Sequence, residues 1–217
     1  MLISSRLFVP SGTMFLLAAG GAIAQCHTYD AIARIQQELL AERPLTGASC
    51  VRLTQSGVPV HLSSLGSSPG GNGVFDAQTV VPIASATKTL SAAVLLSLVD
   101  DGLLALDDRV RDYLPEWDVG LKRFITLRQC FAHTSGMVTG DAAISDPNLT
   151  LRQAAQQLAS VPLDAVPGSQ FAYGGVSMHV AGAVCEVAAG LPWNVLFAQR
   201  IAQPLSLAST DYLTTLS

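Results

Sequence analysis

Apolar residues first recur with a helical period between positions 31 and 41, where Ile32, Ile35, Leu39 and Leu40 fall on one side of the expected helix. Two runs rich in β-branched residues follow at 48–55 and 58–62. The dipeptide Ser56-Gly57 between them is typical of a hairpin turn. The pattern therefore predicts one amphipathic helix followed by one β-hairpin.

The later part of the pattern is helical. Residues 84–101 are apolar apart from Lys88 and the terminal aspartates, which predicts a helix that is buried on nearly every face and ends at Gly102. Four further helices are expected, starting near Thr126, near Thr150, after Tyr173 and at 191–193. No cluster of strand patterns follows residue 70, so the hairpin is the only part of a sheet that we predict.

The N-terminus has the features of a secretory signal peptide. Arg6 precedes an apolar run at 14–24 that is too short to span a bilayer, and Ala22-Ile23-Ala24 before Gln25 is a small-x-small cleavage site. We therefore expect residues 1–24 to be removed, no stable membrane anchor to remain, and the protein to be secreted or periplasmic. A buried N-terminal helix is the alternative, although the proline and glycines of this segment disfavour it.

Composition excludes some classes of function. Of 217 residues 49% are hydrophobic, which is enough for a sizeable core, and 12 Lys and Arg stand against 16 Asp and Glu. No basic surface for nucleic acid is expected from this balance. The mean hydropathy of +0.40 is high, and the N-terminal apolar run accounts for part of it.

The cysteines do not indicate a metal site. Cys26, Cys50, Cys130 and Cys185 lack the close spacing of zinc ligands, and we expect neither a metal nor a cofactor. An oxidising compartment would permit disulfides, but four cysteines allow several connectivities, among which the sequence does not choose. The apolar neighbours of Cys130 and Cys185 favour buried thiols at these two positions.

Ser85 and Lys88 form the first candidate catalytic pair. Residues three apart lie on one face of a helix, so Lys88 can reach the Ser85 hydroxyl. A serine becomes a nucleophile when a neighbour removes its proton, and a lysine does so when its amine is neutral, a form that burial and a helix N-terminus favour. The alternative is a lysine that extends to solvent beside a serine that merely caps the helix.

Tyr173 is the second candidate. It lies in PGSQFAYGG at 167–175, where Pro-Gly and the paired glycines predict a turn that holds the phenol while the backbone approaches a neighbour closely. A phenolic oxygen near a lysine is able to relay a proton to a leaving group. Alternatively, Tyr173 is a core aromatic with a solvated hydroxyl.

These segments resemble, in order, the serine beta-lactamase-related family. The resemblance rests on residues 80–117 around Ser85-x-x-Lys88, on ITLRQCFAHTSGM at 125–137 and on residues 166–190, and it extends from about residue 30 to 217. The family includes class C beta-lactamases, family VIII carboxylesterases, D-alanyl-D-alanine carboxypeptidases and D-aminopeptidases. The resemblance implies an α/β fold of the beta-lactamase/transpeptidase type, an antiparallel sheet flanked by helices with an inserted all-α region. The sheet is expected to be incomplete, with the helix, hairpin and Ser-x-x-Lys helix in 25–120 and mainly helices in 121–217.

The resemblance also implies an acyl-enzyme mechanism. Ser85 would be the nucleophile, Lys88 its base and Tyr173 the second proton carrier, and the Ser85 backbone N–H would help to hold the oxyanion. Gly175 stands at a substrate-binding position where the Tyr-x-Asn motif of the family has an amide, which fits ester cleavage better than beta-lactam turnover. His133 matches a family segment that is structural.

The third box of the family, Lys-Thr-Gly or His-x-Gly, is not found in this sequence, so we expect the chain to be the front part of a longer enzyme. The sequence thus predicts an exported serine hydrolase for a small-molecule ester, a beta-lactam or a peptidoglycan-type D-amino-acid peptide. The alternatives are a non-catalytic fragment or peptidoglycan-binding relic of the same fold, and a secreted helical domain with chance motifs. The substrate and the oligomeric state stay open.

Overall fold

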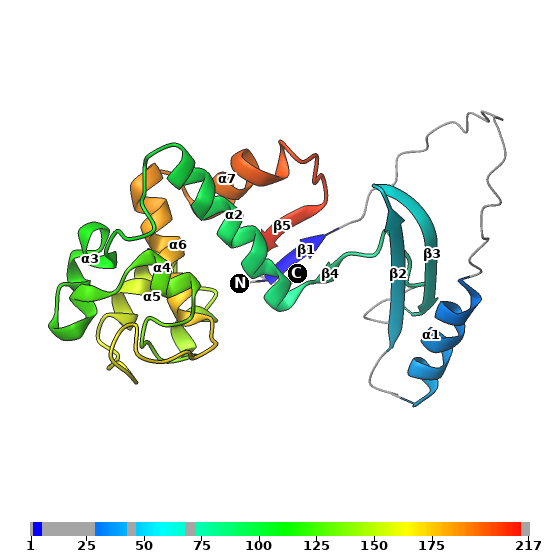
Figure 1. Ribbon diagram of the computed structural model, residues 1–217, viewed down its shortest axis with the longest axis horizontal. Coiled ribbons are helices and arrows are strands. Elements are labelled where there is room, and N and C mark those ends of the chain that lie inside the picture. Colours follow the sequence, from blue (N-terminus) through cyan, green and yellow to red (C-terminus); the bar gives the residue numbers. More distant parts are fainter. Residues whose placement is uncertain (1, 6–28, 43–46, 68–72, 214–217) are drawn as a thin grey trace. The chain divides into compact units, whose positions relative to one another are not determined.

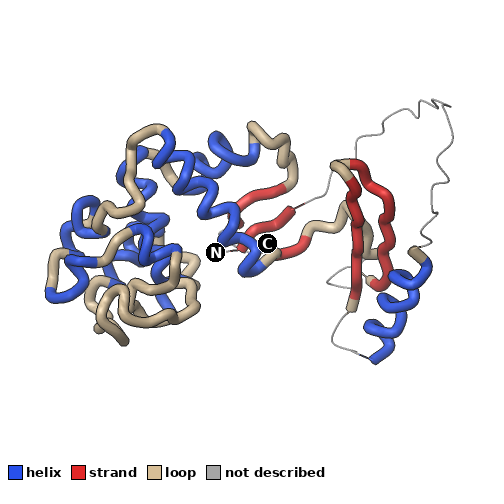
Figure 2. Tube along the Cα trace, viewed as in Figure 1, coloured by secondary structure: helices blue, strands red, loops and turns tan. Residues whose placement is uncertain are grey.

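The computed structural model describes residues 2–5, 29–42, 47–67 and 73–213 (Figures 1 and 2). The chain divides into two compact units, one made of residues 6–80 and the other of residues 1–5 and 81–217. Residues 6–24 of the expected signal peptide, its cleavage site and Cys26 lie outside the described residues. In the part that is described, no single helix is long and apolar enough to cross a membrane, and one pair of helices bent by 80° meets the criterion together.

The unit of residues 6–80 contains helix α1 (Asp30–Glu42) and strands β2 (Ala48–Gln55) and β3 (Val58–Gly66). The other unit contains strands β1 (Leu2–Ser5), β4 (Val81–Pro82) and β5 (Thr210–Leu213). Its α-helices are α2 (Thr87–Asp100), α3 (Val110–Tyr113), α4 (Leu127–Phe131), α5 (Leu151–Leu158), α6 (Val176–Ala189) and α7 (Trp193–Phe197). Short 3-10 turns are η1 (Ala84–Ala86), η2 (Pro115–Trp117), η3 (Gly120–Phe124) and η4 (Ala142–Ile144), and η5 (Ala198–Ala202) is a π-helical turn.

The predicted hairpin is confirmed. Strands β2 and β3 pair in antiparallel register from Ala48 opposite Gly66 to Gln55 opposite Val58. At the turn, Ser56 has a φ of 50° and Gly57 a φ of 80°. Two successive left-handed residues form the turn whose twist matches that of the flanking strands.

Helix α1 presents a different face to the hairpin from the one predicted. Ile35 and Leu39 are 60% and 43% exposed, whereas Gln36 is buried. The Gln36 amide accepts a hydrogen bond from the Ser63 hydroxyl at 2.5 Å and donates one to the Ser49 hydroxyl at 3.0 Å. Because the hairpin offers hydroxyl groups where α1 contacts it, a polar side chain is satisfied there, and the apolar period predicted the wrong face.

A second sheet, in the order β4-β1-β5, was not predicted (Figure 1). Strand β1 lies between its two antiparallel neighbours and pairs Leu2 with Leu213 and Ser4 with Pro82. The prediction that the hairpin is the only sheet was therefore wrong. Strands of two to four residues are too short to show an alternating pattern. Strand β1 also lies within the segment predicted to be a signal peptide.

The helix predicted over 84–101 begins as the 3-10 turn η1 and continues as α2. It is buried on one face, through Thr87, Ser91, Val94, Leu95 and Leu98. On the opposite face Leu96 is 46% exposed. The prediction of burial on nearly every face was wrong, because α6, α7 and η5 contact the helix on one side.

The helices expected near Thr126 and Thr150 are confirmed, and both start with the same reciprocal cap. The Thr126 hydroxyl accepts from the Gln129 backbone N–H at 3.2 Å, and the Gln129 side chain accepts from the Thr126 N–H at 3.1 Å. Thr150 and Gln153 repeat this arrangement at the start of α5. Each cap satisfies two backbone donors that a helix N-terminus leaves free.

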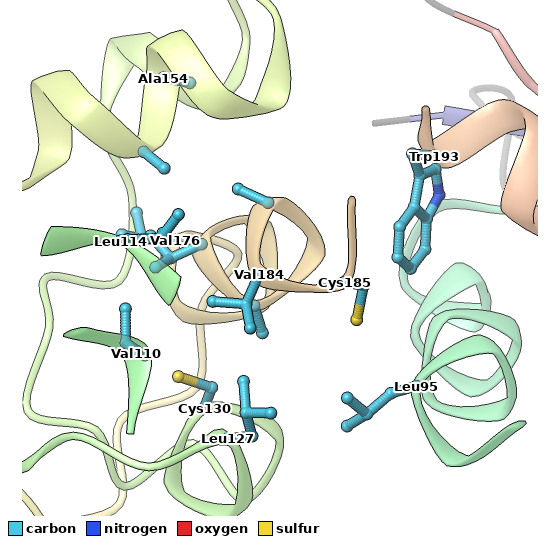
Figure 3. Packing of buried hydrophobic residues seen from close by; sticks show 14 of the residues in the cluster. Leu95, Val110, Leu114, Leu127, Cys130, Ala154, Val176, Val184, Cys185 and Trp193 are labelled. Atoms are coloured by element: carbon cyan, nitrogen blue, oxygen red, sulfur yellow. The ribbon is translucent and has the colours of Figure 1, made fainter. Parts of the chain in front are cut away.

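Helix α6 is the centre of the hydrophobic core (Figure 3). It packs against α2, α3, α4, α5 and α7, so it is surrounded by helices from both earlier and later in the chain. Figure 3 shows Val184 of α6 on the side of Leu127 and Cys185 of α6 on the side of Leu95. Cys130 and Cys185 are free and buried, as predicted, and burial raises the pKa of each thiol to about 12.

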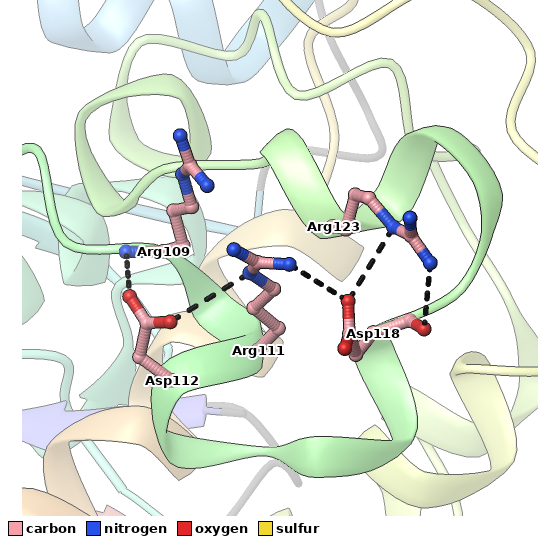
Figure 4. A network of polar contacts seen from close by, with 5 residues as sticks. All are labelled: Arg109, Arg111, Asp112, Asp118 and Arg123. Atoms are coloured by element: carbon pink, nitrogen blue, oxygen red, sulfur yellow. Dashed lines mark hydrogen bonds and ion pairs between the residues drawn. The ribbon is translucent and has the colours of Figure 1, made fainter.

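A network of arginines and aspartates links the short elements between α3 and α4 (Figure 4). Asp118 accepts from Arg111 at 2.8 Å and lies 3.4 Å from Nε of Arg123, and the backbone N–H of Arg109 donates to Asp112 at 3.2 Å. Hydrogen bonding to Arg111 lowers the pKa of Asp118. Exposed ion pairs contribute little each, so the network orients these turns more than it stabilises the core.

Candidate active site

Ser85 lies in η1, where the chain passes from β4 into α2. Ala84 before it has a φ of 43°, a left-handed conformation that is uncommon for alanine. The Ala86 N–H closes the turn on the Ile83 carbonyl at 3.0 Å. This turn leaves the Ser85 side chain exposed at the start of the helix.

Lys88 contacts Ser85 as the spacing predicted. Its Nζ donates to the Ser85 hydroxyl oxygen at 3.2 Å, and the side chain is half-buried in the first turn of α2. The N-cap residue of α2 is Ala86, and no side chain caps this helix. The alternative in which Ser85 is only a helix cap is therefore not what the structure shows.

Tyr173 joins this pair from the loop before α6. The Nζ atom of Lys88 lies 4.7 Å from the centroid of the Tyr173 ring. The Ser85 hydroxyl and then the Lys88 ammonium lower the pKa of the phenol. Tyr173 is 52% exposed, so it is not a core aromatic. The structure thus brings Tyr173 to Ser85 and Lys88, although Tyr173 lies more than eighty positions after them in the sequence.

The loop that carries Tyr173 is held by backbone hydrogen bonds to the segment 133–139. The Ala172 N–H donates to the His133 carbonyl at 2.8 Å, and the Gly175 N–H donates to the Thr139 carbonyl at 2.9 Å. A Cβ atom at Gly174 would lie 2.2 Å from the Thr139 carbonyl oxygen, so only glycine permits this approach. The predicted turn with a close backbone approach is confirmed.

His133 packs against the ring of Tyr173. Its ring lies 4.7 Å from the Tyr173 ring and 5.9 Å from the Phe171 ring, measured between centroids. Burial, and then the charge of Lys88, lower the pKa of His133. An uncharged imidazole packed against the phenol fits the structural role expected for this segment.

Gly175 lines a cavity of about 230 Å³ together with Ser85 and Lys88. A Cβ atom at Gly175 would lie 2.9 Å from Cδ1 of Ile144, so any side chain here would push into this space or displace its wall. The remaining lining residues come from η1, α2, η4, α5, α6 and α7, and they are Ala84, Thr87, Ser91, Ile144, Leu151, Met178, His179, Gly182 and Trp193.

Thr87, His179 and Trp193 are lining residues that the sequence reasoning did not identify. The backbone N–H of His179 donates to the Gly175 carbonyl at 3.0 Å, one helical turn away, and both residues line the cavity. This spacing of four from Gly175 was the available signal for His179. Trp193 reaches the cavity only through the packing of α7 on α6, which no local pattern reports.

No group of three or more His, Cys, Asp or Glu side chains suited to a metal ion occurs among the residues that the structure describes. The side chains of Ser85, Lys88 and Tyr173 bring a hydroxyl, an amine and a phenol to the site. These groups can bind an acyl substrate covalently and move protons between its oxygen atoms.

Comparison with known proteins agrees with this arrangement. The family model Beta-lactamase matches residues 32–215. The chain is 32% identical over 154 residues to esterase EstB of Burkholderia gladioli, covering 63% of this chain and 39% of that protein. It is 31% identical over 153 residues to the D-alanyl-D-alanine-carboxypeptidase/endopeptidase AmpH of Escherichia coli K12, covering 66% of this chain and 40% of that protein. The chain thus spans about two fifths of the length of these relatives.

Solved structures extend the likeness to the fold. A D-stereospecific amidohydrolase from Streptomyces matches with a TM-score of 0.62 and 28% identity, covering 81% of this chain and 55% of that one. The structure has the beta-lactamase/transpeptidase-like fold and covers part of it. With a family model over residues 32–215 and this fold, the chain belongs to the beta-lactamase family, a serine hydrolase family of esterases, carboxypeptidases and beta-lactamases.

Proposed function

We propose that this chain carries the acyl-enzyme centre of a serine hydrolase that cleaves carboxylic esters, with Ser85 as nucleophile, Lys88 as base and Tyr173 as proton carrier. The observation that carries the proposal is the position of the Lys88 amine, 3.2 Å from the Ser85 hydroxyl oxygen and 4.7 Å from the Tyr173 ring. One amine is therefore able to exchange protons with both hydroxyl groups.

In the acylation step, neutral Lys88 takes the proton of Ser85 as the Ser85 oxygen attacks the ester carbonyl carbon. The developing oxyanion is held by the Ser85 backbone N–H at the start of the helix. Tyr173 then donates its proton to the leaving alcohol oxygen, the C–O bond breaks, and the Lys88 ammonium returns a proton to Tyr173. The lowered pKa of Tyr173 favours its role as proton donor in this step.

Deacylation reverses these roles. The Tyr173–Lys88 pair takes a proton from water as the water oxygen attacks the acyl carbon. When the bond to Ser85 breaks, the Ser85 oxygen receives a proton and the carboxylic acid leaves. The three side chains end in their starting protonation states, so the cycle needs no further reactant.

Esters are the substrates that we favour over beta-lactams and peptidoglycan-type peptides. Gly175 offers no side-chain amide beside Lys88, so a substrate amide would find one hydrogen-bonding partner fewer than the family motif provides. Cleavage of an ester needs less help from the site than cleavage of an amide, because an alcohol is a better leaving group than an amine. The similarity to esterase EstB supports this choice.

We also propose that the protein is exported. The support comes from the N-terminal sequence, with Arg6, the apolar run and the small residues before Gln25. The pairing of Leu2–Ser5 with β4 and β5 stands against cleavage, because a mature chain starting at Gln25 would lack β1. Sequencing the N-terminus of the exported protein shows whether residues 1–24 are removed or retained.

The test is covalent labelling of the 217-residue chain followed by intact-mass measurement. A fluorophosphonate and p-nitrophenyl acetate are each expected to leave one adduct, which Ser85→Ala abolishes. Ser169→Ala is the matched control, since Ser169 is an exposed serine whose hydroxyl donates to the Val166 carbonyl at 2.7 Å. Penicillin and a D-alanyl-D-alanine peptide are run in parallel, and faster acylation by either would overturn the choice of esters. No adduct with any probe would favour a non-catalytic member of the fold.

A further inference from the structure

Within the part of the chain that the structure describes, three buried polar atoms around the cavity behind Ser85 have no hydrogen-bonding partner. They are Oγ1 of Thr87, Nε2 of His179 and Nε1 of Trp193, which come from α2, α6 and α7. Thr87 and Trp193 are each only 5% exposed. A buried polar group without a partner costs about 1–3 kcal/mol, so three around one cavity point to an occupant that pairs with them.

The polar side chains next to these three atoms do not form hydrogen bonds with them. The Ser91 hydroxyl also lines the cavity, but it bonds to the Thr87 carbonyl at 3.1 Å and to the Tyr212 hydroxyl at 2.8 Å. The Tyr212 ring packs edge to face on Trp193, with 5.5 Å between centroids, while the Trp193 indole N–H has no hydrogen-bonding partner among the described residues. The three atoms therefore remain available to a molecule inside the cavity.

The cavity runs inward from the nucleophile. Ser85 and Gly175 lie at the starts of the two helices, while Ser91 and Gly182 lie about two turns further along α2 and α6. Ile144, Leu151 and Met178 supply apolar wall. A linear chain attached to the Ser85 oxygen would thus pass apolar side chains and meet polar atoms on the way.

The three unpaired polar atoms favour an occupant that carries an uncharged oxygen atom. The Trp193 indole N–H is a donor only, and the Thr87 hydroxyl donates or accepts. Burial lowers the pKa of His179 to about 4, so its imidazole is uncharged at neutral pH. Lys88 at the outer end is the one cationic residue among those lining the cavity, and no acidic residue lines it. A carboxylate or an ammonium would enter without a counter-charge at the inner end.

The depth of the cavity limits the length of the occupant. The cavity has a volume of about 230 Å³ and extends inward from Ser85 over about two helical turns, roughly 11 Å. This depth matches a short acyl chain and is less than the length of an ordinary fatty acyl chain.

We propose that this cavity is the acyl-binding subsite, and that it selects short linear acyl groups with a neutral ether, carbonyl or hydroxyl oxygen near their far end. The inference rests on the proposed function, since it takes Ser85 as the acylated residue. It adds a substrate class that the Ser85, Lys88 and Tyr173 geometry does not specify.

The first experiment compares two isosteric substrates, p-nitrophenyl 4-methoxybutyrate and p-nitrophenyl hexanoate, which differ by one oxygen in place of a methylene. We expect kcat/KM for the ether to exceed that for the hexanoate by about tenfold, as one added hydrogen bond would give. Trp193→Phe should reduce this ratio to about one. Trp117→Phe is the matched control, because the Trp117 indole already donates to the Ala155 carbonyl at 3.2 Å.

Two further variants test the subsite independently, in case Trp193→Phe does not fold. Thr87→Val keeps the shape of the side chain but removes the hydroxyl, and it should lower the same ratio. Gly182→Ala adds a methyl group 3.5 Å from Cδ1 of Leu151, which leaves the walls in place while reducing the volume. It should slow the six-atom acyl groups relative to acetate. Equal rates for the ether and the hexanoate in the unmodified protein, or fastest turnover of laurate, would overturn the subsite.

The second experiment does not depend on turnover. With the chain labelled with ¹⁵N, 4-methoxybutyramide should shift the indole N–H resonance of Trp193 and leave that of Trp117 unchanged, while hexanamide should have a weaker effect. If no ester acylates Ser85 but this shift occurs, the proposed function fails and the cavity still binds the predicted group. If Ser85 is acylated but neither the shift nor the rate ratio appears, the subsite is refuted and the catalytic proposal stands.

Discussion

The imidazole of His133 packs against the phenol ring of Tyr173, with 4.7 Å between ring centroids and an angle of 49° between planes. His133 has a φ of 57°, a left-handed conformation that turns the segment 133–139 beneath the Tyr173 loop. The Lys88 amine lies 4.7 Å from the centroid of the same Tyr173 ring. Packing against His133 thus restricts the orientation of the proposed proton carrier.

We expect His133→Asn to lower kcat for ester cleavage by about tenfold or more, with a smaller change in KM, because the phenol loses the ring that orients it. Asparagine tolerates the left-handed backbone, so the loop should keep its path. Steady-state kinetics and thermal unfolding of the same preparation check this. Phe171→Leu, which alters the other aromatic neighbour of His133, should leave kcat nearly unchanged, and an equal loss in both variants would contradict the role.

Lys88→Arg should be nearly as damaging as Lys88→Ala. Arginine keeps the positive charge, but it does not become neutral to accept the Ser85 proton. We expect the acylation rate to fall by about 10²–10⁴ in both variants. Stopped-flow measurement of p-nitrophenol release checks this, and an arginine variant within about tenfold of the unmodified chain would exclude Lys88 as the base.

His179 should make the fold sensitive to acid. Its pKa is lowered from 6.5 to about 4 by burial, so the unfolded chain binds a proton more readily than the folded chain. The stability that this residue contributes is present above pH 6.5 and is lost as the pH falls from 6.5 to about 4, by on the order of 3 kcal/mol. Urea unfolding at several pH values measures the loss. His179→Gln should flatten the curve in this window, and an unchanged slope would contradict the assignment.

We expect Glu186→Gln, which removes the charge, to cost less stability than Glu186→Ala, which removes the acceptor oxygen. Its carboxylate accepts from the Trp193 backbone N–H at 2.7 Å at the start of α7, and burial raises its pKa. A raised pKa means that folding favours the protonated form, so its contribution is lost as the pH rises through the folded pKa. Glu186→Gln keeps an acceptor oxygen and should leave stability at pH 7 equal or higher. Glu186→Ala should cost about 1 kcal/mol through the lost cap, which thermal unfolding would detect.

The exported protein is expected to begin at Gln25. Such a chain lacks β1, so β4 and β5 lose the strand that pairs with both. The hydrophobic core cluster of the unit that contains these strands runs from Val94 to Tyr212, and we therefore expect residues 25–217 to unfold cooperatively at a lower Tm than residues 1–217. N-terminal sequencing and calorimetry check the two parts, and an exported protein that retains Met1 would contradict the first.

Local sequence determined the features whose causes lie within a few residues. Thr126 with Gln129 and Thr150 with Gln153 start their helices through side chains three positions apart. Ser56-Gly57 supplies the left-handed pair that a tight hairpin requires. The Ser85–Lys88 contact belongs to the same class, since three residues of helical rise bring the two side chains together.

The resemblance to a family placed Tyr173 beside that pair, but only the tertiary structure shows how it is held, through His133 and the backbone of Thr139. Packing between helices distant in sequence formed the cavity of Thr87, His179 and Trp193. It also placed Gln36 rather than Ile35 against the hairpin. Periodicity reports which residues share a face, whereas the chemistry of the opposing surface decides which face is buried and which polar atoms are left for a ligand.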